Sequence, residues 1–281
     1  MNRLFAALLA LLLLLGLCAC GAPAAATPPV EETPSPAPEA PAPTLTLAPA
    51  PTPAPTPEPT PEPTPEPTPE PTRLTETPDA GQDYQDRFIF IGDSTTYRLV
   101  MEGVLSGGRK THQVWMPQVG TLILSAVSYV RVVYPETGEE LSFAEAAQRA
   151  QPEYMLMTMG LNGISVMDEE WFKQDYRDLI ESIRAVSPDT KIILNSIFPI
   201  AESYVYYGSA RGQIDNDKIR TANEWIEALA EETGCKFLNC YEALVNEDGV
   251  VRPEYDCGDH FHLNADGLNA ELTYLRTHAW L

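Results

Sequence analysis

The sequence predicts an α/β domain built on a central parallel sheet with helices on both faces. Three observations support this fold class. Short, continuous apolar runs indicate strands that are buried on both sides. Segments with apolar residues at helical spacing separate these runs, as in parallel sheets. Both patterns occur only after Asp86, which leaves about 195 residues for the domain, enough for one sizeable core.

Four apolar runs are predicted to be strands of this sheet. Each consists mainly of aliphatic or aromatic residues, and the first ends at Gly92. The runs span residues 88–91, 154–159, 191–197 and, with a weaker pattern, 236–239. Residues 114–116 form a further short candidate, which Pro117 ends.

Helices are predicted between and after these strands. Ser142 and Glu145 have the spacing of a capping box at a helix start, and Pro188 follows the end of a later helical pattern. The predicted helices cover residues 142–150, 171–186, 219–229 and 267–281. The apolar segment 122–133 fits neither the helical nor the strand period, so we leave it unassigned.

Residues 1–20 have the pattern of an export signal. Arg3 precedes an apolar stretch of residues 4–17, which is short for a membrane-spanning helix. Leu17-Cys18-Ala19-Cys20 resembles a bacterial lipobox, although Cys18 is unusual at its position. The resemblance implies that Cys20 is acylated and anchors the protein at the extracellular face of the bacterial cell membrane, in the cell envelope. The alternatives are an uncleaved signal anchor and an ordinary cleaved signal, and all three export the domain.

Residues 21–85 are predicted to be a disordered linker rich in Pro, Thr and Glu, ahead of a domain that spans residues 86–281. All but six of the 27 prolines lie between Pro23 and Pro78. A segment with so few apolar side chains cannot offset its ordering entropy, and its prolines favour an extended chain. The linker acts either as a spacer that lifts the domain off a membrane or as a passive tether.

The charge of the chain excludes one class of partner. The formal net charge is −22, and the region after Gln85 contributes −14 of it, from 30 acidic and 16 basic residues. A domain this acidic is repelled by phosphate backbones, so nucleic acid is not an expected partner.

Three residues supply the groups that a serine hydrolase needs. Ser94 directly follows the first predicted strand, and Asp259 stands three residues before His262. A hydroxyl is a weak nucleophile that needs an adjacent base, and the base needs a group that orients it. Ser94 and Asn162 both follow predicted strands, so we expect them at the carboxyl edge of the sheet, where ligands bind in such folds. His260 is the alternative base.

The order of these blocks resembles a known family. Ile91-Gly92-Asp93-Ser94, Gly120, Gly160-Leu161-Asn162 and Asp259-x-x-His262 are similar to the SGNH branch of the GDSL esterase/lipase family, over residues 86–281. The resemblance implies a three-layer, flavodoxin-like SGNH hydrolase fold. It implies Ser94 as nucleophile, His262 as base and Asp259 as its orienting group. We expect no cofactor or metal, because the serine, histidine and aspartate triad already uses two of the residues that could imitate a metal cluster, Asp256, Asp259, His260 and His262.

The same resemblance implies an oxyanion hole. Its three donors are the amide of Ser94, the amide of Gly120 and the side chain of Asn162. Arg98 stands where the family often has glycine, which could alter the shape of the acyl pocket. A Gly-x-Ser-x-Gly motif is absent from the sequence, which argues against the α/β-hydrolase alternative.

Two further groups of residues bear on the site. Cys235, Cys240 and Cys257 are an odd number of thiols in an exported domain. A Cys240–Cys257 disulfide is one hypothesis, and three free thiols is the other. A loop on the predicted active edge contains aromatic and basic side chains that could stack on sugar rings or cover the core: Tyr204, Tyr206, Tyr207 and Arg211.

The expected function is that of an exported serine esterase. It removes small acyl groups, acetyl above all, from cell-envelope carbohydrate through an acyl-enzyme. An O-acyltransferase that uses the same site is one alternative. A non-catalytic carbohydrate-binding module is another, because a fold alone does not establish an activity.

Overall fold

The structure of the protein is a computed structural model, and it describes residues 71–204 and 213–281. Several predictions fall outside these residues. They are the signal segment, the acylation of Cys20, the linker up to residue 70, and the loop residues Tyr206, Tyr207 and Arg211. Among the described residues, no helix is both long enough and apolar enough to cross a bilayer.

A five-stranded parallel sheet forms the centre of the domain. The strands follow one another across the sheet as β2 (Val114–Trp115), β1 (Phe88–Gly92), β5 (Tyr154–Thr158), β6 (Lys191–Asn195) and β7 (Lys236–Leu238). Every neighbouring pair is parallel. This order is the flavodoxin-like one, in which the chain reverses its direction of travel across the sheet between β1 and β5. The predicted parallel sheet is confirmed, and so is the short strand before Pro117.

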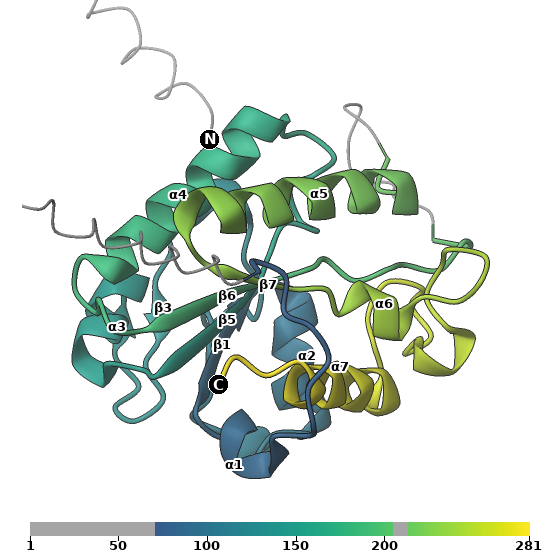
Figure 1. The fold of residues 1–281 in the computed structure, drawn as a ribbon. Helices are drawn as coiled ribbons and strands as arrows, with labels where there is room; N and C mark the ends of the chain where they lie inside the picture. Colours follow the sequence, from purple (N-terminus) through teal and green to yellow (C-terminus); the bar gives the residue numbers. More distant parts are fainter. Residues whose placement is uncertain (1–70, 205–212) are drawn as a thin grey trace, which may run out of the picture. The chain divides into compact units, whose positions relative to one another are not determined.

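Helices cover both faces of the sheet, which gives three layers (Figure 1). One face carries α3 (Phe143–Ala150), α4 (Glu169–Arg184) and α5 (Asn216–Thr233). The other face carries α1 (Gly81–Gln85), α2 (Ser94–Glu102), α6 (Tyr241–Leu244) and α7 (Ala265–Thr277). Short 3-10 turns lie at Gly108–Lys110, Leu124–Ala126 and Pro253–Tyr255.

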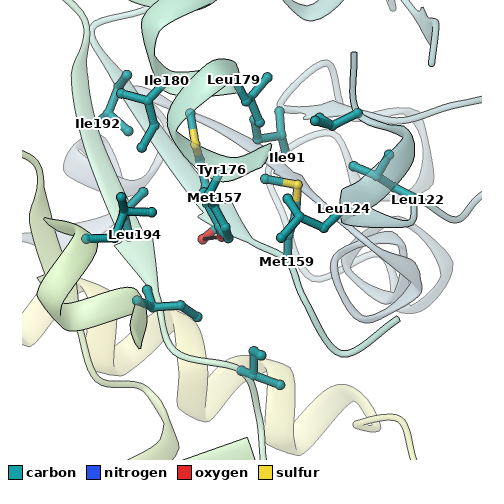
Figure 2. Packing of buried hydrophobic residues seen from close by; sticks show 14 of the residues in the cluster. Ile91, Leu122, Leu124, Met157, Met159, Tyr176, Leu179, Ile180, Ile192 and Leu194 are labelled. Carbon is teal, nitrogen blue, oxygen red and sulfur yellow. Dashed lines mark hydrogen bonds between the residues drawn. The ribbon is translucent and has the colours of Figure 1, made fainter. Parts of the chain in front are cut away.

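Each face of the sheet has its own hydrophobic core, because successive side chains of a strand point to opposite faces. Ile91 and Met157 pack toward α4, where Tyr176 and Ile180 cover them (Figure 2). Phe90, the residue before Ile91, belongs to the cluster on the α7 side. Fully burying a large apolar side chain contributes roughly 1.5–3 kcal/mol. The two cores thus hold the strands in one plane, so that their carboxyl ends form a single edge.

The helices begin where the sequence places capping residues. The Ser142 hydroxyl accepts a hydrogen bond from the Glu145 amide at 3.2 Å, and the Glu145 carboxylate accepts one from the Ser142 amide at 2.8 Å. The predicted capping box is confirmed. Asp168 caps α4 by accepting the Trp171 amide, and Asp215 caps α5 by accepting the Lys218 amide, so both helices begin slightly before their first apolar residue.

The unassigned segment 122–133 is irregular. It contains the 3-10 turn at Leu124–Ala126 and then β3 (Val132–Val133), which pairs with β4 (Glu140–Leu141) in a small antiparallel hairpin. Leu122 and Leu124 are buried against the α4 core (Figure 2). A two-residue strand has no period to detect, which is why the sequence pattern did not resolve this segment.

The predicted linker boundary at residue 85 is wrong, because residues 71–85 pack on the domain. Leu74 donates its amide to the Phe237 carbonyl, and the Phe237 amide donates to Thr72, both at 2.9 Å. Arg73 forms a parallel bridge with Phe237, so this segment adds to the edge of the sheet beside β7. Tyr84 in α1 is only 1% exposed. Two apolar anchors and a free strand edge order a segment whose average composition indicates disorder.

Candidate active site

The site lies at the carboxyl ends of β1 and β5, where the strand order reverses. Ser94 is the first residue of α2, directly after β1, and Asn162 lies in the loop after β5. Both residues line a cavity of about 780 Å³, together with Asp259 and His262 from the loop before α7. The predicted carboxyl-edge position of Ser94 and Asn162 is confirmed.

Ser94, His262 and Asp259 form one chain of hydrogen bonds. His262 Nε2 lies 2.8 Å from Ser94 Oγ, and His262 Nδ1 lies 2.7 Å from Asp259 Oδ2. A carboxylate accepts only, so Nδ1 carries the proton that it shares with Asp259, and Nε2 is left to accept the serine proton. This is the geometry of a hydroxyl activated by an oriented imidazole.

Asp259 is held in its ionised form. Burial favours the neutral acid, but Asp259 accepts hydrogen bonds from the His262 amide at 2.8 Å and the Phe261 amide at 2.9 Å. Together with the His262 ring, these bonds outweigh burial and lower the pKa of Asp259 to about 2. Asp259 is therefore a carboxylate at neutral pH, and it orients the imidazole through Nδ1.

His260 does not reach the serine. Its Nδ1 lies 3.0 Å from Asp256 Oδ2, and its side chain points to solvent with half of its area exposed. Asp256 Oδ1 also accepts the amides of Gly258 and His260, which folds the loop back on itself. His260 takes the left-handed backbone conformation, with φ of 68°. This turn separates the two imidazoles, and His262 alone contacts Ser94.

Asp93 stabilises the start of α2, where Ser94 lies, a role that the sequence analysis did not assign. Its carboxylate caps α2 by accepting the Thr95 amide at 3.0 Å and the Thr95 hydroxyl at 2.7 Å. It also accepts the backbone N–H of Asn162, which ties the β1 and β5 loops together. Burial raises the pKa of Asp93, although these hydrogen bonds oppose the rise. The position directly before a helix is a capping signal that could have identified this residue.

The three predicted oxyanion donors differ in availability. The Ser94 amide makes no hydrogen bond to any described residue and lies at the N-terminus of α2. Asn162 Nδ2 donates to the Thr121 hydroxyl at 3.1 Å and to the Leu122 carbonyl at 3.2 Å. The Gly120 amide donates to the Pro117 carbonyl at 2.9 Å, so in this conformation it is not available to a substrate.

Gly120 differs from its prediction because it closes a tight turn. Its φ is 71°, and a Cβ there would lie 2.9 Å from the Tyr97 ring. The next residue, Thr121, is the one that lines the cavity. The glycine is therefore required by backbone shape, and it places Thr121 beside Asn162.

Aromatic rings form one wall of the cavity. Phe261 lies between Tyr204 and His262, and its ring centroid is 4.8 Å from each of theirs. The sequence placed Tyr204 on the active edge, but it did not single out Phe261. These rings, with Ile123 and Val166, make the walls of the cavity largely apolar around the polar triad.

Arg98 forms a hydrogen bond to the loop that carries His262, which we call the histidine loop. Its Nε donates to the Leu263 carbonyl at 3.2 Å, and its guanidinium pairs with Glu102 on the next turn of α2. Arg98 does not line the cavity, so the structure does not support the expectation that it shapes an acyl pocket. It connects α2, which carries Ser94, with the residue that follows His262.

The three cysteines of the domain are free thiols, so the hypothesis of a Cys240–Cys257 disulfide is wrong. Cys240 is fully buried under α7, where its sulfur lies 3.9 Å from the Glu271 carbonyl. Cys257 lies in the loop that carries Asp259 and is partly exposed. The core packing of Cys240 keeps the two sulfurs apart.

The fold and this hydrogen-bonded serine, histidine and aspartate are those of a serine hydrolase built on a flavodoxin-like parallel sheet. The chain belongs to the GDSL-like lipase/acylhydrolase family, whose sequence profile matches residues 90–270. The protein is accordingly an enzyme that hydrolyses ester bonds. The family resemblance seen in the sequence is confirmed.

A solved structure shares this fold at low sequence identity. A Streptococcus pneumonia protein, provisionally described as a platelet activating factor, is 20% identical with a TM-score of 0.50, covering 68% of this chain and 82% of that one. A GDSL-like lipase from Bacteroides thetaiotaomicron is less similar, with 16% identity and a TM-score of 0.46, covering 68% of this chain and 86% of that one. A family 3 carbohydrate esterase from Talaromyces cellulolyticus is 17% identical (TM-score 0.41, 66% and 92% covered). No curated protein sequence matches the chain.

Proposed function

We propose that the protein is an exported serine esterase that removes small acyl groups, acetyl above all, from cell-envelope carbohydrate. The observation that carries the proposal is the unbroken hydrogen-bond chain from Ser94 through His262 to Asp259. The three side chains stand in the order of nucleophile, base and orienting group that acyl transfer from an ester requires.

The reaction proceeds in two halves. His262 Nε2 accepts the Ser94 proton as Ser94 Oγ bonds to the ester carbonyl carbon. The bond to the alcohol oxygen then breaks, and His262 returns the proton to the departing alcohol. In the second half, His262 takes a proton from water as the water oxygen bonds to the acyl carbon. His262 then returns this proton to Ser94 Oγ as the bond between Oγ and the acyl carbon breaks and the acid leaves.

The negative oxygen that forms in each half is stabilised at the start of α2. The free Ser94 amide points from a helix N-terminus, where the backbone dipoles favour negative charge. Asn162 Nδ2 adds a second donor by exchanging the Thr121 hydroxyl for the substrate oxygen. One such donor is typically worth about 10²–10³ in turnover.

The cavity supports a substrate that is mostly neutral. Its walls combine aromatic rings with the Thr121 and Ser165 hydroxyls. Among the described residues that line it, Asp259 is the one acidic side chain and His262 the one basic side chain. A volume of about 780 Å³ leaves space for an alcohol the size of a sugar beside a small acyl group. The acidic domain disfavours anionic substrates.

An acyltransferase is the second candidate, because the same acyl-enzyme could donate its acyl group to a sugar hydroxyl in place of water. We favour hydrolysis because the chain belongs to an acylhydrolase family.

The location of the enzyme is part of the proposal. The lipobox-like Leu17-Cys18-Ala19-Cys20 supports a lipid anchor at Cys20 on the extracellular face of a bacterial membrane. Growth with a labelled fatty acid should label the full-length protein, and Cys20→Ala should remove the label. Equal labelling of both proteins would contradict the anchor.

The activity is tested with p-nitrophenyl esters from acetyl to octanoyl, on the full-length protein beside Ser94→Ala. We expect turnover that is fastest on acetyl and at least about 10³-fold slower in the variant. An active-serine phosphonate probe should label the parent protein and not Ser94→Ala. Turnover that survives the substitution would refute the assignment of Ser94.

A further inference from the structure

A second cavity adjoins the one that holds Ser94. Its volume is about 650 Å³, and it lies where α4 and α5 begin. Ser165 and Val166 line both cavities, so a ridge of two residues separates them. Val166 is 40% exposed although it is a large apolar residue. A ligand that leaves the first cavity over this ridge enters the second one.

The lining of the second cavity combines one aromatic ring with polar side chains. Trp225 on α5 packs at 5.7 Å and 60° on the Phe172 ring, which fixes the orientation of the indole. Thr221 lies one helical turn before it, and its hydroxyl donates to the Asp217 carbonyl while its lone pairs stay available. A sugar ring has apolar C–H faces and a rim of hydroxyl groups, so it matches an aromatic face bordered by hydrogen-bonding groups.

The charges of this cavity favour a neutral ligand. Asp168 and Asp217 contribute two carboxylates, and Lys218 contributes one ammonium group. The ammonium group already donates to the Gln213 carbonyl, and Asp217 pairs with Arg220. A phosphate or carboxylate ligand would meet more negative than positive charge here, whereas sugar hydroxyls can bond to either.

We infer that the second cavity is a subsite for the sugar residues next to the one that carries the acyl group. The inference rests on the proposed function and narrows its substrate from sugar esters in general to oligosaccharide or polysaccharide esters. Binding of remote sugars lowers the transition-state free energy of the step at Ser94 if these contacts persist in the transition state. Activity should therefore rise with the length of the glycan.

The test compares O-acetylated N-acetylglucosamine with its O-acetylated trimer, on the full-length protein. We expect kcat/KM to be about tenfold higher for the trimer, which corresponds to one contact of moderate strength. Thr221→Arg should fill the cavity and remove this advantage while p-nitrophenyl acetate hydrolysis stays within about twofold of the parent. Trp225→Leu should do the same by removing the ring.

Thr273→Arg is the matched control. Thr273 is an exposed threonine on α7 whose hydroxyl donates to the carbonyl four residues earlier, as that of Thr221 does. The control should keep the full advantage of the trimer. The p-nitrophenyl acetate rate also reports whether each variant is folded, so a misfolded variant is recognised and the remaining variant decides.

The outcomes separate this inference from the proposed function. Hydrolysis of p-nitrophenyl acetate and the monomer, with no advantage for the trimer, would overturn the subsite and leave the esterase proposal intact. If no ester is hydrolysed, the esterase proposal fails. Calorimetry then measures binding of the unacetylated trimer to the parent and to Thr221→Arg. Tighter binding by the parent would support the subsite, and equal binding or no binding would overturn it.

Discussion

Glu271 predicts an unusual dependence of stability on pH. This glutamate of α7 is 2% exposed. Its Oε1 accepts a hydrogen bond from Asn195 Nδ2 at 3.3 Å, while its Oε2 is buried and has no partner among the described residues. With no positive charge to compensate it, burial raises the pKa of Glu271 to about 8. The folded protein therefore keeps a neutral glutamic acid in its core at neutral pH.

The sign of the effect follows from the two pKa values. The unfolded chain loses the proton near pH 4.5, whereas the folded protein keeps it until about pH 8. Between these values the folded state binds one proton more, so its stability falls by about 1.4 kcal/mol for each pH unit. From pH 4.5 to pH 7 the loss from this one group is about 3 kcal/mol. The contribution is fully present below pH 4.5 and lost as the pH approaches 8.

Glu271→Gln isolates this term, because glutamine has a similar shape and no proton to lose. We measure the free energy of unfolding in urea at pH 5, 6, 7 and 8. The value for the variant minus that for the parent should rise by about 1 kcal/mol per pH unit. Other titrating groups are common to both proteins and cancel in the difference. Glu181→Gln, on the exposed face of α4, should show no such trend. A difference between Glu271→Gln and the parent that stays constant over this pH range would refute the reasoning.

Four further substitutions have expected outcomes. Asp259→Asn should lower kcat by about 10³–10⁴ with KM nearly unchanged, because the imidazole loses its oriented tautomer. Arg98→Ala should lower kcat about tenfold and leave KM within about twofold, because the histidine loop loosens while the cavity stays. Gly120→Ala should destabilise the fold by about 1–3 kcal/mol in urea unfolding, since its φ is 71° and the new Cβ meets the Tyr97 ring. Leu74→Ala should lower the unfolding temperature by a few degrees, because it removes a buried anchor of the N-terminal segment.

Each of these expectations has a result that contradicts it. A large rise in KM for Arg98→Ala would place the arginine in substrate binding. Near-normal turnover by Asp259→Asn would mean that another group orients His262. Unchanged stability of Gly120→Ala would show that the turn can relax, and an unchanged unfolding temperature for Leu74→Ala would show that residues 71–75 do not support the domain.

The sheet and most helices were predictable because buried positions recur in the sequence with the period of a strand or a helix. The runs of β1, β5 and β6 are apolar on both faces, as strands between two helical layers must be. The capping pair Ser142 and Glu145 marked α3 to the residue. The small hairpin of β3 and β4 and the four-residue α6 have no such mark, because a period needs more residues than they contain.

The three catalytic side chains were predictable because a serine, a histidine and an aspartate in this order have a defined chemical role in a serine hydrolase. Ser94, Asp259 and His262 lie together because α7 packs in the same hydrophobic cluster as α2, which brings the loop before α7 to Ser94. The donors were less predictable, because an amide can bond to a substrate or to its own loop, and sequence does not tell which. The Gly120 amide bonds to Pro117, and Asn162 bonds to the loop that follows Gly120.

The pairing of Thr72 and Arg73 with β7 also determines where a mechanical force applied at the N-terminal side of the domain enters the sheet. The segment runs parallel to β7, so its Pro71 end lies at the amino ends of the strands and Ser94 lies at the opposite edge. Any load carried through the preceding chain enters the sheet on the side away from the catalytic opening. A load applied along the strand would be shared in shear by the Thr72 and Leu74 hydrogen bonds to Phe237, which would then not open one after the other.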